Sequence, residues 1–160
     1  MKKDIFTYLL NNNSRDLGSF SNPIFNINYL QKKNNYVKIT CYVDQFEAML
    51  LTLSDITNLM YLETNLNQIN SYNSTTKGTS NILCVINRTI QESSSSGYQN
   101  SNASYQGPQT PIELGSLPDN ISLKLVKANG NVVDMDTGNN PFTVKLRFEC
   151  EYETGCGCGC

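Results

Sequence analysis

The chain of 160 residues has the length of a single domain that can bury a sizeable hydrophobic core. Its net charge is −2 and its basic residues are scattered, with Lys2-Lys3 and Lys32-Lys33 as the only basic pairs, which argues against a nucleic-acid-binding face. The sequence contains no histidine and no apolar run long enough for a membrane span, so it predicts no membrane span and excludes Ser-His and Cys-His catalysis.

Amides and hydroxyls supply more of the polar surface than charges do. Charged residues make up 16% of the chain, whereas asparagine occupies 22 positions and serine 15. A surface of this kind repels neighbouring copies only weakly, which suits a protein that packs into an assembly. AT-rich coding DNA would enrich asparagine as well, so composition alone leaves both interpretations open.

The chain begins with MKKDIFTYLL, which imitates a signal peptide. Asp4 and Thr7 interrupt the apolar run and no small-residue cleavage site follows, so secretion is not predicted. The six cysteines are then expected to be reduced thiols. Residues 4–10 fit either a short helix or an extended segment. We predict that residues 1–20 form an N-terminal arm that docks on an adjacent subunit.

Residues 21–153 are predicted to form the folded domain, because strand-like patterns recur along them. Residues 24–30 alternate between apolar and polar side chains. Residues 45–63 fit either a helix or strands, and the β-rich surroundings favour strands. Residues 37–43 also alternate, and four of their side chains are predicted to face inward: Val37, Ile39, Cys41 and Val43.

The middle of the chain combines a buried strand with polar loops. Residues 81–87, NILCVIN, are apolar on both faces and predict a central strand that is covered on each side. Residues 92–111 have almost no apolar content, so they are predicted to form a long exposed loop. Residues 69–81 are predicted to form a shorter loop of the same kind.

Two clear strands close the domain. Ile121, Leu123 and Leu125 are predicted to face inward and to lead into a type I′ turn at Asn129-Gly130, with VVDM as the return strand. DMDTGNN, residues 134–140, resembles a calcium loop faintly, but it lacks the spacing of an EF-hand and predicts a plain turn. Residues 142–152 alternate strictly, and their predicted inner side chains are Phe142, Val144, Leu146, Phe148, Cys150 and Tyr152.

These patterns predict an all-β fold: a single antiparallel β-sandwich of about eight strands. Cys41, Cys84 and Cys150 lie within strands and are interpreted as buried apolar thiols. The chain has no glycine-rich phosphate loop, and its acids are dispersed, so we predict that it is not an enzyme and needs no cofactor. The acids considered are Asp44, Glu47, Asp55, Glu63, Asp119, Asp134 and Asp136.

A Gly/Cys tail, residues 154–160, follows the last strand and is predicted to be flexible. In an extended chain Cys156, Cys158 and Cys160 face one side, with neighbours about 7 Å apart. A disulfide between residues two apart is strained, and three thiols fall short of the four ligands of a structural zinc site. Tails meeting at a symmetry axis would supply enough sulfur. The three cysteines therefore predict a soft-metal site or interchain disulfides, with an incidental tail as the alternative.

The order of three motifs carries a family resemblance: Glu47-Ala48 with Leu50, the Asn129-Gly130 turn, and Pro141-Phe142 followed by Val144, Leu146 and Phe148. Over about residues 22–152 the chain resembles the small jelly-roll structural proteins of large eukaryotic double-stranded DNA viruses, virophages and polinton-like elements. These include penton, minor capsid and fibre-head proteins. The resemblance implies a sandwich of jelly-roll type.

The function expected from this resemblance is that of a structural subunit of a virus particle, assembled in the infected host cell. The expected partners are other capsid proteins and further copies of the chain, as a trimer or pentamer, with no nucleic acid. The alternative is a receptor- or glycan-binding head of a surface fibre that uses the 92–111 loop as its contact surface.

Overall fold

The computed structural model describes residues 1–27, 35–51, 59–66, 68, 72–73, 78–79, 81–91, 100–105 and 111–153. Within these ranges the regular structure is β throughout, apart from the short 3-10 turn η1 (Asn12–Ser14). The strands pair antiparallel, which confirms the predicted all-β sandwich. No helix in the described ranges is long and apolar enough to cross a membrane.

The main sheet has ten strands, where the sequence predicted about eight. Nine of them follow the order β1-β12-β4-β9-β8-β5-β11-β3-β2, and β10 pairs with β4. A separate hairpin joins β6 and β7. The bounds are β1 Lys2–Asn11, β2 Leu17–Gly18, β3 Pro23–Asn26, β4 Tyr36–Leu51, β5 Leu59–Thr64, β6 Tyr72–Asn73, β7 Gly78–Thr79, β8 Ile82–Gln91, β9 Asn100–Tyr105, β10 Ile112–Leu114, β11 Asn120–Lys127 and β12 Phe142–Tyr152.

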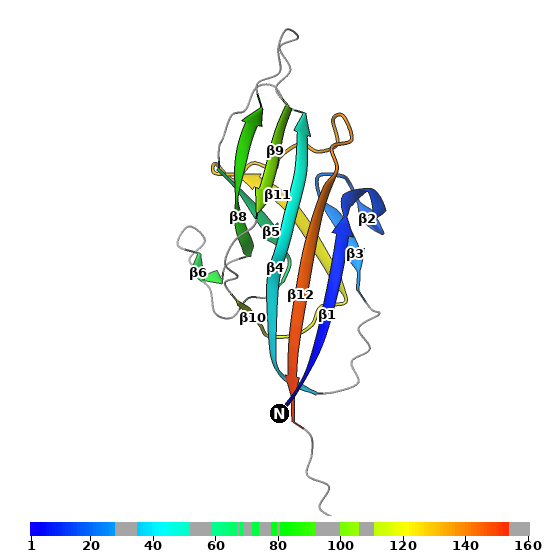
Figure 1. Cartoon of the computed structure of the whole chain (residues 1–160), viewed down its shortest axis with the longest axis vertical. Coiled ribbons are helices and arrows are strands. Elements are labelled where there is room, and N and C mark those ends of the chain that lie inside the picture. The colour runs from blue at the N-terminus through cyan, green and yellow to red at the C-terminus, as the bar shows by residue number, and fades with distance from the viewer. Residues whose placement is uncertain are drawn as a thin grey trace, which may run out of the picture.

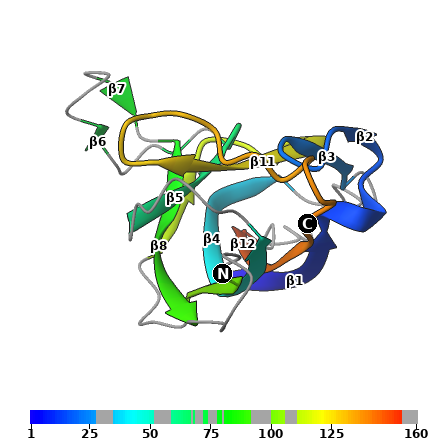
Figure 2. The same ribbon diagram turned by 90° about the horizontal axis from the view of Figure 1, so that it is seen from above.

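The sheet curls into two facing layers. Strands β4, β12 and β1 lie side by side toward the viewer in Figure 1. The end-on view in Figure 2 places β5, β11, β3 and β2 on the other side of the core, with β8 where the two layers join.

The core fills the space between the layers with the side chains that alternation predicted. Phe142, Val144, Leu146, Phe148 and Cys150 of β12 are buried, and so are Ile121, Leu123 and Leu125 of β11. Full burial of each large apolar side chain stabilises the fold by roughly 1.5–3 kcal/mol. Tyr152, predicted to face inward as well, is only half-buried at the end of its strand.

Val37 was predicted to face inward, but it is 57% exposed. The reason is a β-bulge: Glu151 pairs with Lys38 and Tyr152 with Tyr36, so Val37 has no residue opposite it. The extra residue reverses the alternation at this point. Ile39, Cys41 and Val43 follow the prediction and are buried.

A bulge also changes the predicted central strand at residues 81–87. The register between β5 and β8 shifts at Leu62 and Glu63, and both Leu83 and Cys84 are buried as a result. Val85 then points outward and is 45% exposed. The strand is central in the sheet order, as predicted, but it is not covered on both faces.

The predicted hairpin at Asn129-Gly130 forms with a different turn. Gly130 N donates to Lys127 O and Lys127 N donates to Asn131 O, both at 2.9 Å, which encloses a three-residue loop. Gly130 alone adopts positive φ (+86°), so the turn is not type I′. Residues 132–135 return through a single bridge, Val126 with Val132, and not as the predicted strand.

The N-terminal segment predicted as an arm forms strand β1 of the chain's own sheet. Lys2–Asn11 pairs with β12 along its whole length, from Lys2 opposite Tyr152 to Asn11 opposite Thr143. Phe6 and Tyr8 face the core, and the Tyr8 ring meets the Phe148 ring edge-on at 6.0 Å. Phe6, Tyr8 and Leu10 are two residues apart, which is the period of a strand.

Part of the predicted loop 92–111 is also a strand. Asn100–Tyr105 forms β9 and pairs with both β4 and β8. Every residue except proline carries the same backbone donor and acceptor, so a segment with few apolar side chains can complete a sheet where two neighbouring strands each offer an unpaired side. Residues 92–99 and 106–110 lie outside the described residues.

Candidate functional site: the outer face of β1, β12 and β4

The outer face of β1, β12 and β4 is the surface of these strands that points away from the core (Figure 1). Along β12 it carries Thr143, Lys145, Arg147, Glu149 and Glu151, each partly exposed. The register sets Leu9, Thr7, Ile5 and Lys3 of β1 beside the last four of these. This face combines two features that the sequence prediction did not bring together: an apolar row and a row of charges.

The apolar row runs along β1. The described residues contain seven exposed large hydrophobic side chains, and three of them are Met1, Ile5 and Leu9, which are 80%, 59% and 71% exposed. Odd-numbered residues share one side of β1, so Ile5 and Leu9 lie on the outer face, alternating with Lys3 and Thr7, and Met1 directly precedes the strand. Exposed apolar side chains on a sheet face are available for contact with a partner.

The charges on the adjacent strands form an ion-pair network. Lys3 Nζ lies 2.7 Å from a Glu149 carboxylate oxygen, which lowers the pKa of Glu149 and raises that of Lys3. Arg147 Nε lies 3.2 Å from Asp44, and the same guanidinium contacts Glu149. The guanidinium also stacks over the Tyr42 ring, 4.2 Å from its centroid. Exposed pairs of this kind contribute little stability each, so the network mainly fixes the positions of the charges.

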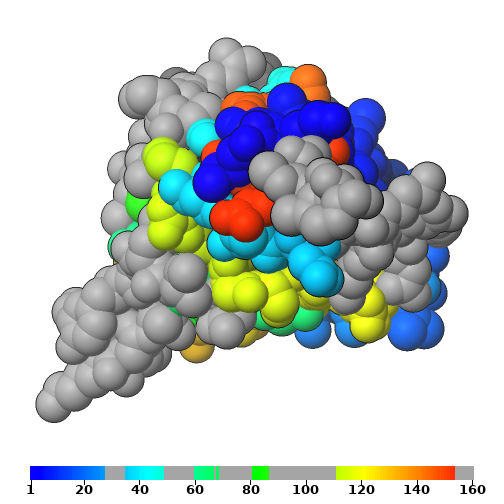
Figure 3. All heavy atoms as spheres, turned by 90° about the horizontal axis from the view of Figure 1, so that it is seen from below, coloured from blue at the N-terminus to red at the C-terminus, as the bar shows by residue number. Residues whose placement is uncertain are grey.

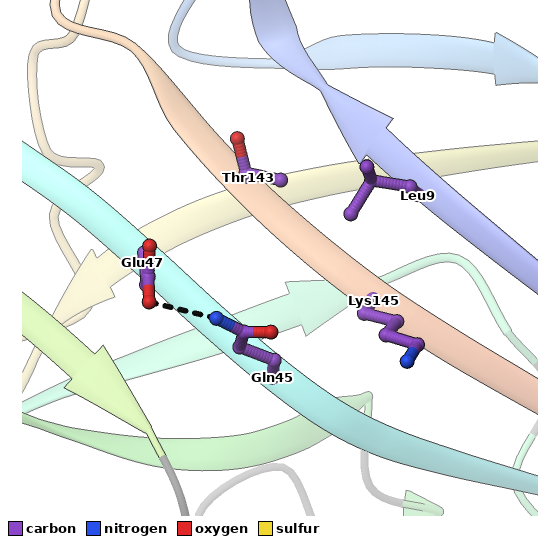
Figure 4. A pocket seen from close by; sticks show the side chains of 5 residues that line it. All are labelled: Leu9, Gln45, Glu47, Thr143 and Lys145. Carbon is purple, nitrogen blue, oxygen red and sulfur yellow. Dashed lines mark hydrogen bonds between the residues drawn. The ribbon is translucent and has the colours of Figure 1, made fainter.

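At one end of this face lies a shallow depression lined by Leu9, Gln45, Glu47, Thr143 and Lys145 (Figure 4). Gln45 Nε2 donates to Glu47 at 2.7 Å. Among the described side chains no carboxylate lies within ion-pair distance of Lys145, in contrast to Lys3, Lys38 and Arg147. The depression is too open to enclose a small molecule, but the Lys145 ammonium group is available to a partner.

At the opposite end the first and last strands of the sandwich meet. Figure 3 shows N-terminal atoms in blue and the end of β12 in red side by side, as the pairing of Lys2 with Tyr152 requires. Just inside, Tyr36 Oη donates to Asp4 at 3.1 Å. Burial, followed by this bond, raises the pKa of Tyr36 to about 12. The phenol therefore stays neutral at physiological pH and holds a hydrogen bond.

The three cysteines predicted to be buried are buried and unpaired. Desolvation raises the pKa of Cys84 to about 12 and that of Cys150 to about 11, and it raises that of Cys41 further. A thiol with so high a pKa carries little thiolate, which is the reactive form. These residues therefore act as small apolar core side chains, as the sequence predicted.

The metal or disulfide site predicted at Cys156, Cys158 and Cys160 lies outside the described residues, as does the rest of the tail. In the part of the chain that the structure covers, no three His, Cys, Asp or Glu side chains gather as a metal site. The prediction for the tail stays a prediction.

The 134–140 segment is a turn, as predicted, and its carboxylates accept hydrogen bonds from the chain's own backbone and side chains. Asp134 accepts bonds from Asp136 N at 2.9 Å and Thr137 N at 3.0 Å, and its other oxygen accepts from the Thr137 hydroxyl. Hydrogen bonds from Thr137 lower the pKa of Asp134. Asp136 accepts from Phe20 N at 2.8 Å, and its pKa is lowered mainly by a bond from Ser21.

The dispersed acids stay apart in the fold where they can be located. Asp44 pairs with Arg147 and Glu63 with Lys124, on opposite layers of the sandwich. Asp55 lies outside the described residues. The described residues thus offer ion pairs and an apolar row on one sheet face, and that face is the candidate site. No protein-family model matches this chain, and no curated protein matches its sequence.

Proposed function

We propose that this chain is a structural subunit of a virus particle, a minor capsid, penton or related coat protein with a sandwich of jelly-roll type. It acts by self-association and by contact with other capsid proteins. The observation that supports this most directly is the outer face of β1, β12 and β4. That face presents exposed apolar side chains beside positioned charges, and the depression at one end of it is too open to enclose a small molecule.

Three further features support an assembly role. The sandwich carries its stability in its core, so its outer face is free to serve a contact. The amide-rich surface repels other copies weakly, because only 16% of the residues are charged. The resemblance of residues 22–152 to small jelly-roll coat proteins rests on strand and turn motifs that the sandwich accommodates.

The proposal is tested by locating the protein. Particles would be purified from a culture whose virus or element encodes the chain, and they would then be labelled with an antibody against it and digested for mass spectrometry. We expect a fixed number of copies per particle and immunogold label on the particle surface or vertices. Absence from purified particles, with the protein abundant in the infected cell, would overturn the proposal.

The same preparation separates a coat subunit from a receptor-binding head. A coat subunit binds the other capsid proteins and leaves cells unlabelled. Binding of the isolated protein to cell-surface glycans, without binding to capsid proteins, would favour the head.

A further inference from the structure

The charges on the outer face of β12 follow an antisymmetric pattern. The outward residues on either side of Phe148 are Arg147 and Lys145 in one direction and Glu149 and Glu151 in the other. Two positive charges thus mirror two negative charges about the middle of the strand. The register of β12 with β1 and β4 shows that this row lies in the centre of a three-stranded face.

From this pattern we propose that the outer face of β1, β12 and β4 binds the same face of a second copy, with the strands of the two copies antiparallel. A twofold axis opposite Phe148 brings Lys145 of one copy against Glu151 of the other, and Arg147 against Glu149. A two-fold contact is self-complementary, so each of these pairs occurs twice. The parallel arrangement would set like charges against each other and is disfavoured.

The neighbouring strands fit the same arrangement. On β1 the axis lies beside Phe6, because Phe6 pairs with Phe148. Ile5 then faces Thr7 of the other copy, and Leu9 faces Lys3, whose aliphatic stem can cover it. On β4, Lys38 pairs with Glu151 and Gln45 pairs with Lys145. The axis therefore places Lys38 of one copy opposite Gln45 of the other. The arrangement therefore opposes no two like charges on the three strands.

Two observations identify the charges that a partner would use. Lys145 lies beyond ion-pair distance of every described carboxylate, and Glu151 reaches Lys3 only at 3.8 Å. Arg147 and Glu149, nearer the axis, already bond within the chain. The outer pair, Lys145 with Glu151, therefore gains most from a second copy and should determine whether two copies bind.

The size of the face sets the expected affinity. Three strands about 4.8 Å apart and some ten residues long cover roughly 450 Å² per copy. Stable interfaces bury about 800 Å² per partner, so this contact belongs to the weak, concentration-dependent class. Such a contact becomes effective where many copies are held close together. The inference deepens the proposed function and rests on its self-association, because a particle provides that concentration.

Charge reversal tests the proposal in the full-length chain by sedimentation equilibrium across about 1 µM to 1 mM protein. Lys145→Glu sets two acids against each other, and Glu151→Lys sets two bases, so each variant alone should dimerise about tenfold more weakly. In an equimolar mixture of the two variants, the mixed dimer has opposite charges at both contacts, and the double variant K145E/E151K also restores both. We expect dimerisation to recover in the mixture and in the double variant.

Matched controls separate this contact from general effects of charge. Lys124→Glu reverses a lysine that pairs with Glu63 at 2.9 Å on the opposite layer, and it should leave dimerisation unchanged. Leu9→Ser should weaken the dimer, whereas Val85→Ser, at an exposed site on β8, should not. Circular dichroism would verify that each variant is folded.

The outcomes are decisive in both directions. A wild-type chain that remains monomeric up to about 1 mM overturns the inference, and so does a dimer that is equally stable in Lys145→Glu and Lys124→Glu. Neither result rejects the coat role, which depends on finding the protein in particles, but a monomer at about 1 mM would leave contact with other capsid proteins as the mode of action. Conversely, if the protein forms a charge-dependent dimer but is absent from particles, the inferred contact stands and the coat role is rejected.

Discussion

Strand β12 has two faces with different tasks. Its inner side chains from Phe142 to Cys150 are at most 1% exposed, and they pack against the opposite layer, where Ile121, Leu123 and Leu125 are equally buried. Its outer side chains are partly exposed and bear a block of positive charge followed by a block of negative charge. The inner face carries most of the stability of the fold, because buried apolar area contributes far more than exposed ion pairs. The outer face can therefore carry a binding function at little cost to folding.

The substitution expected to have the largest effect on stability is Phe148→Ala on the inner face. Phe148 is fully buried and meets the Tyr8 ring, so we expect a loss of about 3–5 kcal/mol in the free energy of unfolding, measured by urea denaturation. Lys145→Ala, three residues earlier on the outer face, should change it by less than about 0.5 kcal/mol at dilute concentration. Similar losses for the two variants would contradict the comparison.

Thiol protection tests the same difference without altering the core. In a variant with Cys156, Cys158 and Cys160 changed to Ser, only Cys41, Cys84 and Cys150 remain, and all three are buried. We expect labelling by a thiol reagent at pH 8 to be at least about a hundredfold slower in the native protein than in urea, because labelling requires unfolding. Rapid labelling of all three thiols in the native protein would show that the inner face is open.

An intermediate effect is expected at the polar link that joins the two layers. Asn12 is fully buried, and its amide donates to Asn140 O at 2.9 Å and to Phe20 O at 3.2 Å, while its oxygen accepts from Phe142 N at 2.9 Å. Asn12→Ala removes all three of these bonds, two of which are buried, and this should cost about 1–3 kcal/mol by denaturation. Asn13→Ala, at the exposed neighbouring position, should be nearly neutral.

The smallest expected effect is the pH dependence of the outer face. The hydrogen bond from Lys3 lowers the pKa of Glu149 below its ordinary value of 4.5. The stabilisation from this pair is thus complete above the unfolded pKa and is lost as the pH falls through the lower, folded pKa. Between about pH 5 and pH 3 the wild type should lose slightly more stability than Glu149→Gln. Parallel pH profiles would show that the network is not maintained in solution.

Strict alternation was enough to predict some elements from sequence. The inner row of β12 and the buried residues of β11 follow the predicted period of two, since each side chain alternates about a regular backbone. The buried cysteines followed from the same pattern. The type I′ turn at Asn129-Gly130 was wrong because the loop contains three residues, with Gly130 alone at positive φ.

Other features depended on neighbours that are distant in sequence. The exposure of Val37 follows from a bulge opposite Glu151 and Tyr152, which its own segment does not encode. Strand β9 is polar and forms because β4 and β8 flank it. The candidate site has the same origin: Ile5 and Glu149 are 144 positions apart, and only the pairing of β1 with β12 sets them side by side.

The sequence by itself determined that this protein is an antiparallel sandwich, because the period of its apolar residues fixes which side chains must leave water. The tertiary structure decided which strands are neighbours, since backbone pairing is indifferent to side-chain type and is settled by packing across the whole sheet. The outer face of β1, β12 and β4 is a product of that second step. Its charges and its apolar row come from segments at opposite ends of the chain, and strand pairing alone makes them one surface.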